Sequence, residues 1–266
     1  MLLYAKKYAI CHFCSNFAII MLITTQAIVL HTIKYGDQKL ITDLYTRRQG
    51  RLSFAVNIPK TTQGKLKKQY FQPLTMLTIE ADLRQQAPLQ KLRDVALLAP
   101  FSSLLTNPSK LSISIFISEF LYHALRSEQQ DEPMFDYIAA SLQWLDGCTT
   151  SYANFHLVFL MHLSRFLGFY PNLDQPIGEH ATPLYFDLRA ASFCQHPPVH
   201  RDFLPPEEAG MLRLMMRMDY PTMHLFQLNR QQRNRCIEVA LQFYRLHLPD
   251  FPDLRSLDVL RELWND

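Results

Sequence analysis

The chain has 266 residues, of which 48% are hydrophobic and 12% aromatic, so it can bury a large core, and intrinsic disorder is excluded. Seven glycines and 16 prolines exclude a fibrous or low-complexity protein. The net charge is only +3, yet residues 21–100 carry 12 Lys/Arg and 5 Asp/Glu, whereas residues 101–266 carry 13 and 19. The basic first part favours a polyanionic partner, with a merely solvated basic surface as the alternative.

The first thirty residues contain a long apolar stretch, Tyr8–Leu30, with no Lys, Arg, Asp or Glu. Its length allows a membrane span or a signal peptide, but polar residues interrupt it and no cleavage site is evident. From Met21 onward the stretch is typical of a first strand. We therefore interpret residues 1–20 as an extension of the chain ahead of a natural start at Met21.

Strand signals dominate residues 21–100. The run Leu52–Ile58 alternates apolar and small or polar residues between Gly50 and Pro59, which is the pattern of a half-buried strand. Five short strands in this length predict a small closed barrel of the OB type. The predicted strands are Ile23–Ile33, Lys39–Thr46, Leu52–Ile58, Gln72–Glu80 and Lys91–Leu98.

Cations gather at two places in this part of the chain. One group lies around Gly50, and a second precedes the aromatic pair Tyr70 and Phe71. Cations bind phosphates and rings stack on bases, so the pattern suits single-stranded nucleic acid, with core packing of the two rings as the alternative. The candidate phosphate contacts are Lys34, Lys39, Arg47, Arg48, Arg51, Lys60, Lys65, Lys67 and Lys68.

Helical periodicity replaces alternation after Pro100, so residues 101–266 predict a helical domain and the fold class is α+β. Asn107-Pro108 is a helix start signal, and the proline-rich segment 172–206 is predicted to be irregular. The predicted helices are Ser109–Ser127, Met134–Leu145, Asn154–Phe169, Glu207–Met218, Gln231–Leu246 and Ser256–Trp264.

No catalytic motif is present: the phosphate-binding loop, the dinucleotide fingerprint, the nucleophile elbow and the zinc-protease helix motif are all missing from the sequence. We therefore predict a protein without enzymatic activity, although scattered active-site residues are an open alternative. The five cysteines are odd in number and irregularly spaced, which fits a reducing compartment. Cys11-x-x-Cys14 without a second pair is weak evidence for zinc.

Several motifs, in this order, resemble the bacterial RecO family of recombination mediators. They are Ala27–Thr32, Tyr35-Gly36-Asp37, Leu40-Ile41-Thr42, Thr46–Arg51, Phe155–Leu173 and Tyr185–Arg189 with the text to Cys194. The resemblance implies an N-terminal OB-fold, a helical C-terminal domain, and binding to single- and double-stranded DNA with annealing of complementary strands. It also implies RecR and single-stranded-DNA-binding protein (SSB) as partners in loading RecA, in the bacterial cytoplasm at the nucleoid.

One departure from the family concerns zinc. Many members carry a four-cysteine module, whose positions fall here at Pro176, Glu179, Cys194 and Pro197. Three of the four are not cysteine, so we expect no metal and no cofactor, and segment 172–206 is a degenerate zinc module. A substitute site is the alternative, built from Cys194, His196, His200 and His180.

The arginines around Gly50 are the leading candidates for DNA contact. Reversing Arg47, Arg48 and Arg51 together is expected to abolish DNA binding with the fold intact. Two rival interpretations remain besides the enzyme: a membrane-anchored protein using residues 8–30, and a protein-binding adaptor using the acidic helical half.

Overall fold

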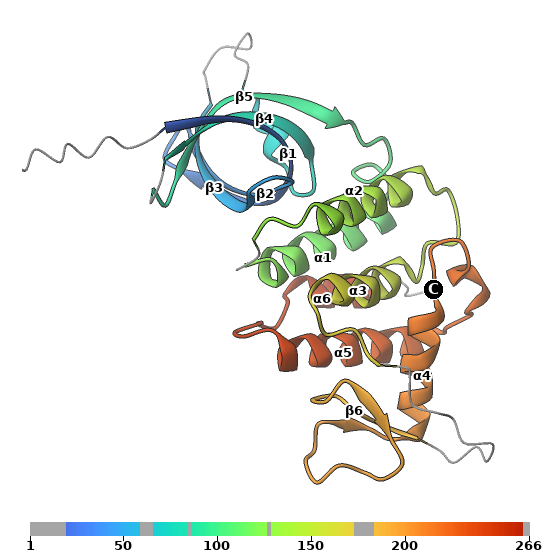
Figure 1. The fold of residues 1–266 in the computed structure, drawn as a ribbon. Helices are drawn as coiled ribbons and strands as arrows, with labels where there is room; N and C mark the ends of the chain where they lie inside the picture. The colour runs from blue at the N-terminus through green and yellow to red at the C-terminus, as the bar shows by residue number, and fades with distance from the viewer. Residues whose placement is uncertain (1–19, 59–65, 85–86, 127–128, 173–183, 263–266) are drawn as a thin grey trace, which may run out of the picture.

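A barrel of strands lies at one end of the molecule, and layers of helices and a small sheet follow it (Figure 1). The computed structural model describes residues 20–58, 66–84, 87–126, 129–172 and 184–262. Cys11, Cys14, Lys60, Lys65 and His180 lie outside the described residues.

The barrel confirms the predicted OB-type fold of the N-terminal part. Its strands close in the order β1-β2-β3-β5-β4, and β3 and β5 form the parallel pair among antiparallel neighbours. Alternate residues, such as Val29, Leu44 and Phe54, fill the interior. The strands are β1 (Ile20–Tyr35), β2 (Lys39–Thr46), β3 (Gly50–Asn57), β4 (Met76–Arg84) and β5 (Gln90–Ala99), with a short 3-10 turn η1 (Lys68–Phe71) between β3 and β4.

The fourth strand begins four residues later than the sequence predicts. Pro73 lacks an N–H donor, and Leu74 has a φ of 64°, so the chain turns at this point before β4 begins at Met76. The start of β1 also differs, because the strand already pairs with β4 at Ile20. Residues 20–30 therefore form part of the barrel, which contradicts a membrane-spanning helix over 8–30. None of the helices in the described ranges is long and apolar enough to cross a membrane.

All six predicted helices are present, with ends shifted by a few residues. The first begins as its sequence indicates: the Asn107 side chain accepts hydrogen bonds from the backbone N–H groups of Ser109 and Lys110, and Pro108 occupies the first turn. The helices are α1 (Pro108–Ala124), α2 (Glu132–Gly147), α3 (Phe155–Phe166), α4 (Pro206–Arg217), α5 (Arg230–His247) and α6 (Ser256–Glu262), with a 3-10 turn η2 (Met223–Leu225).

A small antiparallel sheet interrupts the helical part, where the sequence predicts irregular chain. It has the order β7-β6-β8, with β6 (Tyr185–Asp187), β7 (Ser192–Cys194) and β8 (Phe203–Leu204). Phe186 and Phe193 are buried and lie edge to face, 4.9 Å apart between ring centres. Strands of two or three residues are too short to show a period in the sequence.

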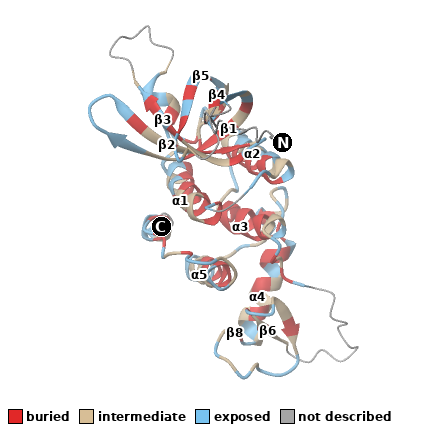
Figure 2. Cartoon of the chain, turned by 60° about the vertical axis from the view of Figure 1, so that its left-hand side comes forward, coloured by how far each residue is buried: buried red, intermediate tan, exposed pale blue. Residues whose placement is uncertain are grey.

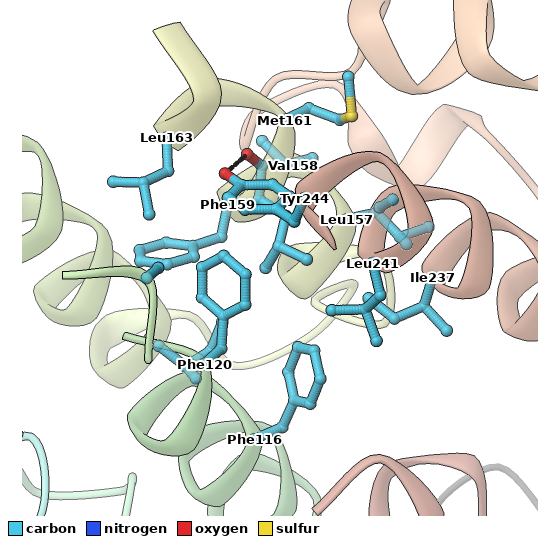
Figure 3. Packing of buried hydrophobic residues seen from close by; sticks show 14 of the residues in the cluster. Phe116, Phe120, Leu157, Val158, Phe159, Met161, Leu163, Ile237, Leu241 and Tyr244 are labelled. Carbon is cyan, nitrogen blue, oxygen red and sulfur yellow. Dashed lines mark hydrogen bonds between the residues drawn. The ribbon is translucent and has the colours of Figure 1, made fainter. Parts of the chain in front are cut away.

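One apolar core runs through the helices and on to the barrel. Phe116 and Phe120 of α1 meet α3 and α5, and the Tyr244 hydroxyl donates to the Leu160 carbonyl at 2.7 Å (Figure 3). The same cluster includes Leu30 and Tyr45, from outward-facing positions of the barrel. Each fully buried large side chain contributes about 1.5–3 kcal/mol, so the barrel and the helices stabilise each other.

The segment between the barrel and α1 is held by Asp146 at the end of α2. Its carboxylate accepts hydrogen bonds from the backbone N–H groups of Ser102, Ser103 and Leu104, at 2.7 to 2.9 Å. Partial burial opposes ionisation, but these hydrogen bonds outweigh it and lower the pKa of Asp146 from 3.8 to about 2. The connection is therefore fixed to α2.

Two of the arginines around Gly50 join the barrel to the helices. Arg47 forms a bidentate pair with Asp136 at 2.9 and 3.0 Å and lies 3.2 Å from Glu132. Arg51 donates to the Tyr122 carbonyl at 2.6 Å, and its guanidinium lies 4.5 Å from the centre of the Tyr122 ring. We therefore revise the expectation that reversing all three arginines leaves the fold intact, because these two side chains are part of it.

The Asp146 contact predicts an acid-sensitive connection. Because the pKa of Asp146 is lower in the folded protein, its contribution to stability is present above about pH 4 and is lost as the pH falls toward 2. Asp146→Asn should lower the free energy of unfolding by about 1 kcal/mol at pH 7, after allowance for solvent screening. It should also flatten the dependence of stability on pH between 4 and 2. Denaturant titrations at several pH values measure both effects, and parallel curves for the two proteins would contradict the assignment.

The Arg47 contact predicts a difference between neighbouring arginines. Arg47→Glu would place a third carboxylate beside Glu132 and Asp136, so the melting temperature should fall. Arg48→Glu is the matched control because Arg48 is exposed, and no carboxylate of the described chain lies within 4 Å of it, so its melting temperature should stay unchanged. Thermal melts of the two variants measure this difference. Equal melting temperatures would contradict a structural role for Arg47.

Candidate nucleic-acid interface

The outer face of β1, β2 and β3 is open to solvent at the end of the barrel away from the helices. Antiparallel partners share one side of a sheet, and Lys39 is paired with Tyr35 on one side and with Asn57 on the other. Two residues further along β2, and on the same side of the sheet, Ile41 is paired with Ile33 and Ala55. Residues 33–39 are all exposed and form a hairpin that extends beyond the barrel wall (Figure 2).

The structure adds Lys91 to this face. Lys91 of β5 is the parallel partner of Ala55, and both residues are exposed. Its antiparallel partner Asp82 forms an ion pair with Arg93 at 2.7 Å. Sequence reasoning missed Lys91 because the pairing of β3 with β5 is not visible from local pattern. The period-two exposure of Lys91 and Arg93 around buried Leu92 was the available signal.

The two predicted lysines of the hairpin lie on opposite sides of it, because Lys39 is paired with Tyr35 and Lys34 is paired with Leu40. Lys34 is the neighbour of Tyr35 near the end of β1, and Lys39 begins β2, after a three-residue turn that includes Gly36 with a φ of 74°. Both lysines are exposed, and neither has a carboxylate within 4 Å in the described ranges. The turn itself carries one exposed carboxylate, Asp37.

Lys67 and Lys68 lie at η1 and are exposed. The rings that follow them do not share this exposure: Phe71 is buried in the barrel interior, and Tyr70 packs against the same cluster. The core alternative therefore holds for both rings.

The opposite end of this face is electrically neutralised. Asp43 is paired with His31 across β1, and its carboxylate accepts hydrogen bonds from Arg51 at 3.4 Å and from the Ser53 hydroxyl. The structure thus separates the predicted cations into two sets. Arg47 and Arg51 face the helices, whereas the predicted Lys34 and Lys39, together with Lys91, which was not predicted, face solvent at the other end. Arg48 is exposed beside the first set.

A cleft of about 1160 Å³ lies where the barrel meets α1 and α6. Its rim includes the exposed side chains of Leu111, Ile115 and Val259, and its polar groups include Glu119, which accepts hydrogen bonds from the backbone N–H groups of Arg255 and Ser256. An apolar rim of this kind suits a protein segment better than a phosphate chain.

The described residues of the degenerate zinc module, 172 and 184–206, engage their candidate ligands in other contacts, and His180 lies outside the described residues. The Cys194 thiol donates to the Tyr185 carbonyl, and His200 Nε2 lies 3.3 Å from the Asp187 carboxylate. Within the described ranges no group of three or more His, Cys, Asp or Glu side chains could hold a metal ion. The described residues of this segment therefore do not fit the four-cysteine zinc module that the resemblance implies.

Two family models match the chain, and they divide it where strands give way to helices. The model described as "Recombination protein O N terminal" matches residues 21–101, and the one described as "Recombination protein O C terminal" matches residues 105–258.

Curated relatives match along most of the chain. A protein of Phocaeicola vulgatus named "DNA repair protein RecO" is 48% identical over 245 residues, which cover 92% of this chain and 100% of the relative. A protein of Bacteroides fragilis with the same name is also 48% identical, with 92% and 100% coverage. One of Christiangramia forsetii is 32% identical with the same coverage. The chain belongs to the RecO family of DNA repair proteins.

Proposed function

We propose that the chain is a DNA-binding recombination mediator without enzymatic activity, which anneals complementary single strands. The observation that carries this proposal is the solvent-exposed hairpin end of the barrel, where Lys39 and Lys91 lie on the outer face and Lys34 belongs to the same hairpin. Strands β2 and β3 and the adjoining loops are the surface that OB-folds use for oligonucleotides. Family membership and the names of the relatives support a role in DNA repair.

The chemistry of the face suits binding without base specificity. Lysine ammonium groups contact phosphates as point charges, which gives affinity and a strong dependence on salt but no sequence information. Annealing needs no covalent step, because neutralising the phosphates lets two polyanions approach. Double-stranded DNA offers the same phosphate contacts. Its affinity should be lower than that of a single strand wherever unpaired bases also contribute to binding.

The proposal includes partners. A mediator of this kind would act with RecR on single-stranded DNA coated by SSB, so that RecA is loaded. It would work in the bacterial cytoplasm at the nucleoid, where the thiols of Cys148, Cys194 and Cys236 would stay reduced. Binding measurements with purified RecR and SSB test this part separately from DNA binding.

A protein-binding adaptor is the second candidate, and the apolar cleft beside α1 and α6 favours it. The two roles use different surfaces, so they can be separated. DNA binding through the lysine face should weaken steeply as salt rises, whereas binding of a protein in the apolar cleft should depend little on salt.

A double charge reversal tests the DNA interface. Lys39→Glu with Lys91→Glu should weaken single-stranded DNA binding by about tenfold or more and lower the slope of log affinity against log salt by about 1.4, because each lost phosphate contact removes about 0.7. Both side chains are exposed, so the melting temperature should not change. Fluorescence anisotropy of a labelled oligonucleotide at several salt concentrations measures both quantities.

The matched control is Arg201→Glu with Arg217→Glu, which makes the same change in net charge on exposed residues of the helical part. Its DNA affinity should fall only slightly, with the slope unchanged. Equal losses in the two double variants would mean that net charge, and not this face, governs binding.

A further inference from the structure

Tyr35 is unusual among the aromatic residues. Of all Phe, Tyr and Trp residues in the described ranges, it is the one that counts as exposed, with 62% of its surface open to solvent. Every other such ring is buried or partly covered. An aromatic ring left in water gives up the stabilisation that burial would provide, and its face stays open to a ligand.

The backbone holds Tyr35 in a defined place. It is the last residue of β1 and is paired with Lys39, while the preceding pair joins Lys34 to Leu40, which is buried in the barrel interior. Leu40 thereby anchors the base of the hairpin, and the register places the Tyr35 ring and the Lys39 ammonium on one side of it.

Apolar surface continues from the ring along the same face. The next pair on this side is Ile33 with Ile41; Ile33 is 46% exposed and Ile41 is partly exposed. This face therefore carries apolar groups, the Tyr35 ring with Ile33 and Ile41, beside the charged groups of Lys39 and Lys91. A single strand of nucleic acid likewise carries apolar base faces beside charged phosphates.

We propose that Tyr35 stacks on a base of bound single-stranded DNA, with the next base over Ile33 and Ile41 and the backbone along Lys39. This inference rests on the proposed function and adds what the lysines do not supply, which is preference for single strands. In a duplex the bases are already stacked and paired, so the ring has no base face to contact. Lys39 beside the ring and Lys91 further along the same face favour a polyanion over an apolar protein segment.

Substitutions at Tyr35 test the stacking contact. Tyr35→Ala should weaken binding of an oligothymidine by about tenfold, within the range measured for single stacked bases elsewhere, and leave binding of a duplex of equal length within about twofold. Tyr35→Phe keeps the ring and should bind both DNAs like the parent protein. Leu225→Ala, another exposed apolar residue at 68%, is the control and should change neither affinity. Circular dichroism confirms that the fold is retained.

A spectroscopic measurement gives an independent answer. The variant Tyr35→Trp places an indole at the hairpin tip, and stacking on thymine should quench its fluorescence on addition of oligothymidine, relative to the parent protein with its own tryptophans. Absence of extra quenching, or equal losses for single strands and duplex in Tyr35→Ala, would overturn the stacking role. The proposed function would survive either result as long as the Lys39 and Lys91 reversals still weaken binding by about tenfold or more. It would fail, together with this inference, if the parent protein bound no DNA.

Discussion

The rest of the structure depends on the apolar contact between the outer wall of the barrel and the helices. Ile28, Leu30, Tyr45 and Met76 point outward from the strands and belong to the same core as α1 and α3. This contact covers one end of the outer face and leaves the hairpin end free. A ligand of the barrel can therefore bind only on the part that the helices leave open, and the free lysines lie there.

Much of the fold could be predicted because local pattern and tertiary position agree. The alternating pattern in Leu52–Ile58 correctly predicted β3, and Asn107-Pro108 correctly predicted the start of α1. The failures have physical causes. The turn at Pro73 and Leu74 delays β4, and the strands of the small sheet are held by packing of Phe186 and Phe193, which no periodicity reveals.

The site was only partly predictable, because a cation in the sequence does not show which charge it faces. Arg47 and Lys39 look equivalent along the chain, yet Arg47 meets Asp136, 89 residues away, whereas Lys39 is exposed to water. Lys91 reaches the face through a parallel pairing, and the role proposed for Tyr35 rests on its exposure, so both require the three-dimensional arrangement.

If DNA binds on the outer barrel face as proposed, the neutralised end of that face limits the length of strand that the barrel contacts. From Lys39 to Asp43, whose charge is taken up by Arg51, the strand advances four residues, or about 14 Å. The footprint is then only a few nucleotides, toward the small end of what one OB-fold covers. A short footprint means a short residence time for each bound segment. Under the proposed annealing role, a strand that has found its complement would then leave the protein, so a small site would favour turnover of strands over their storage.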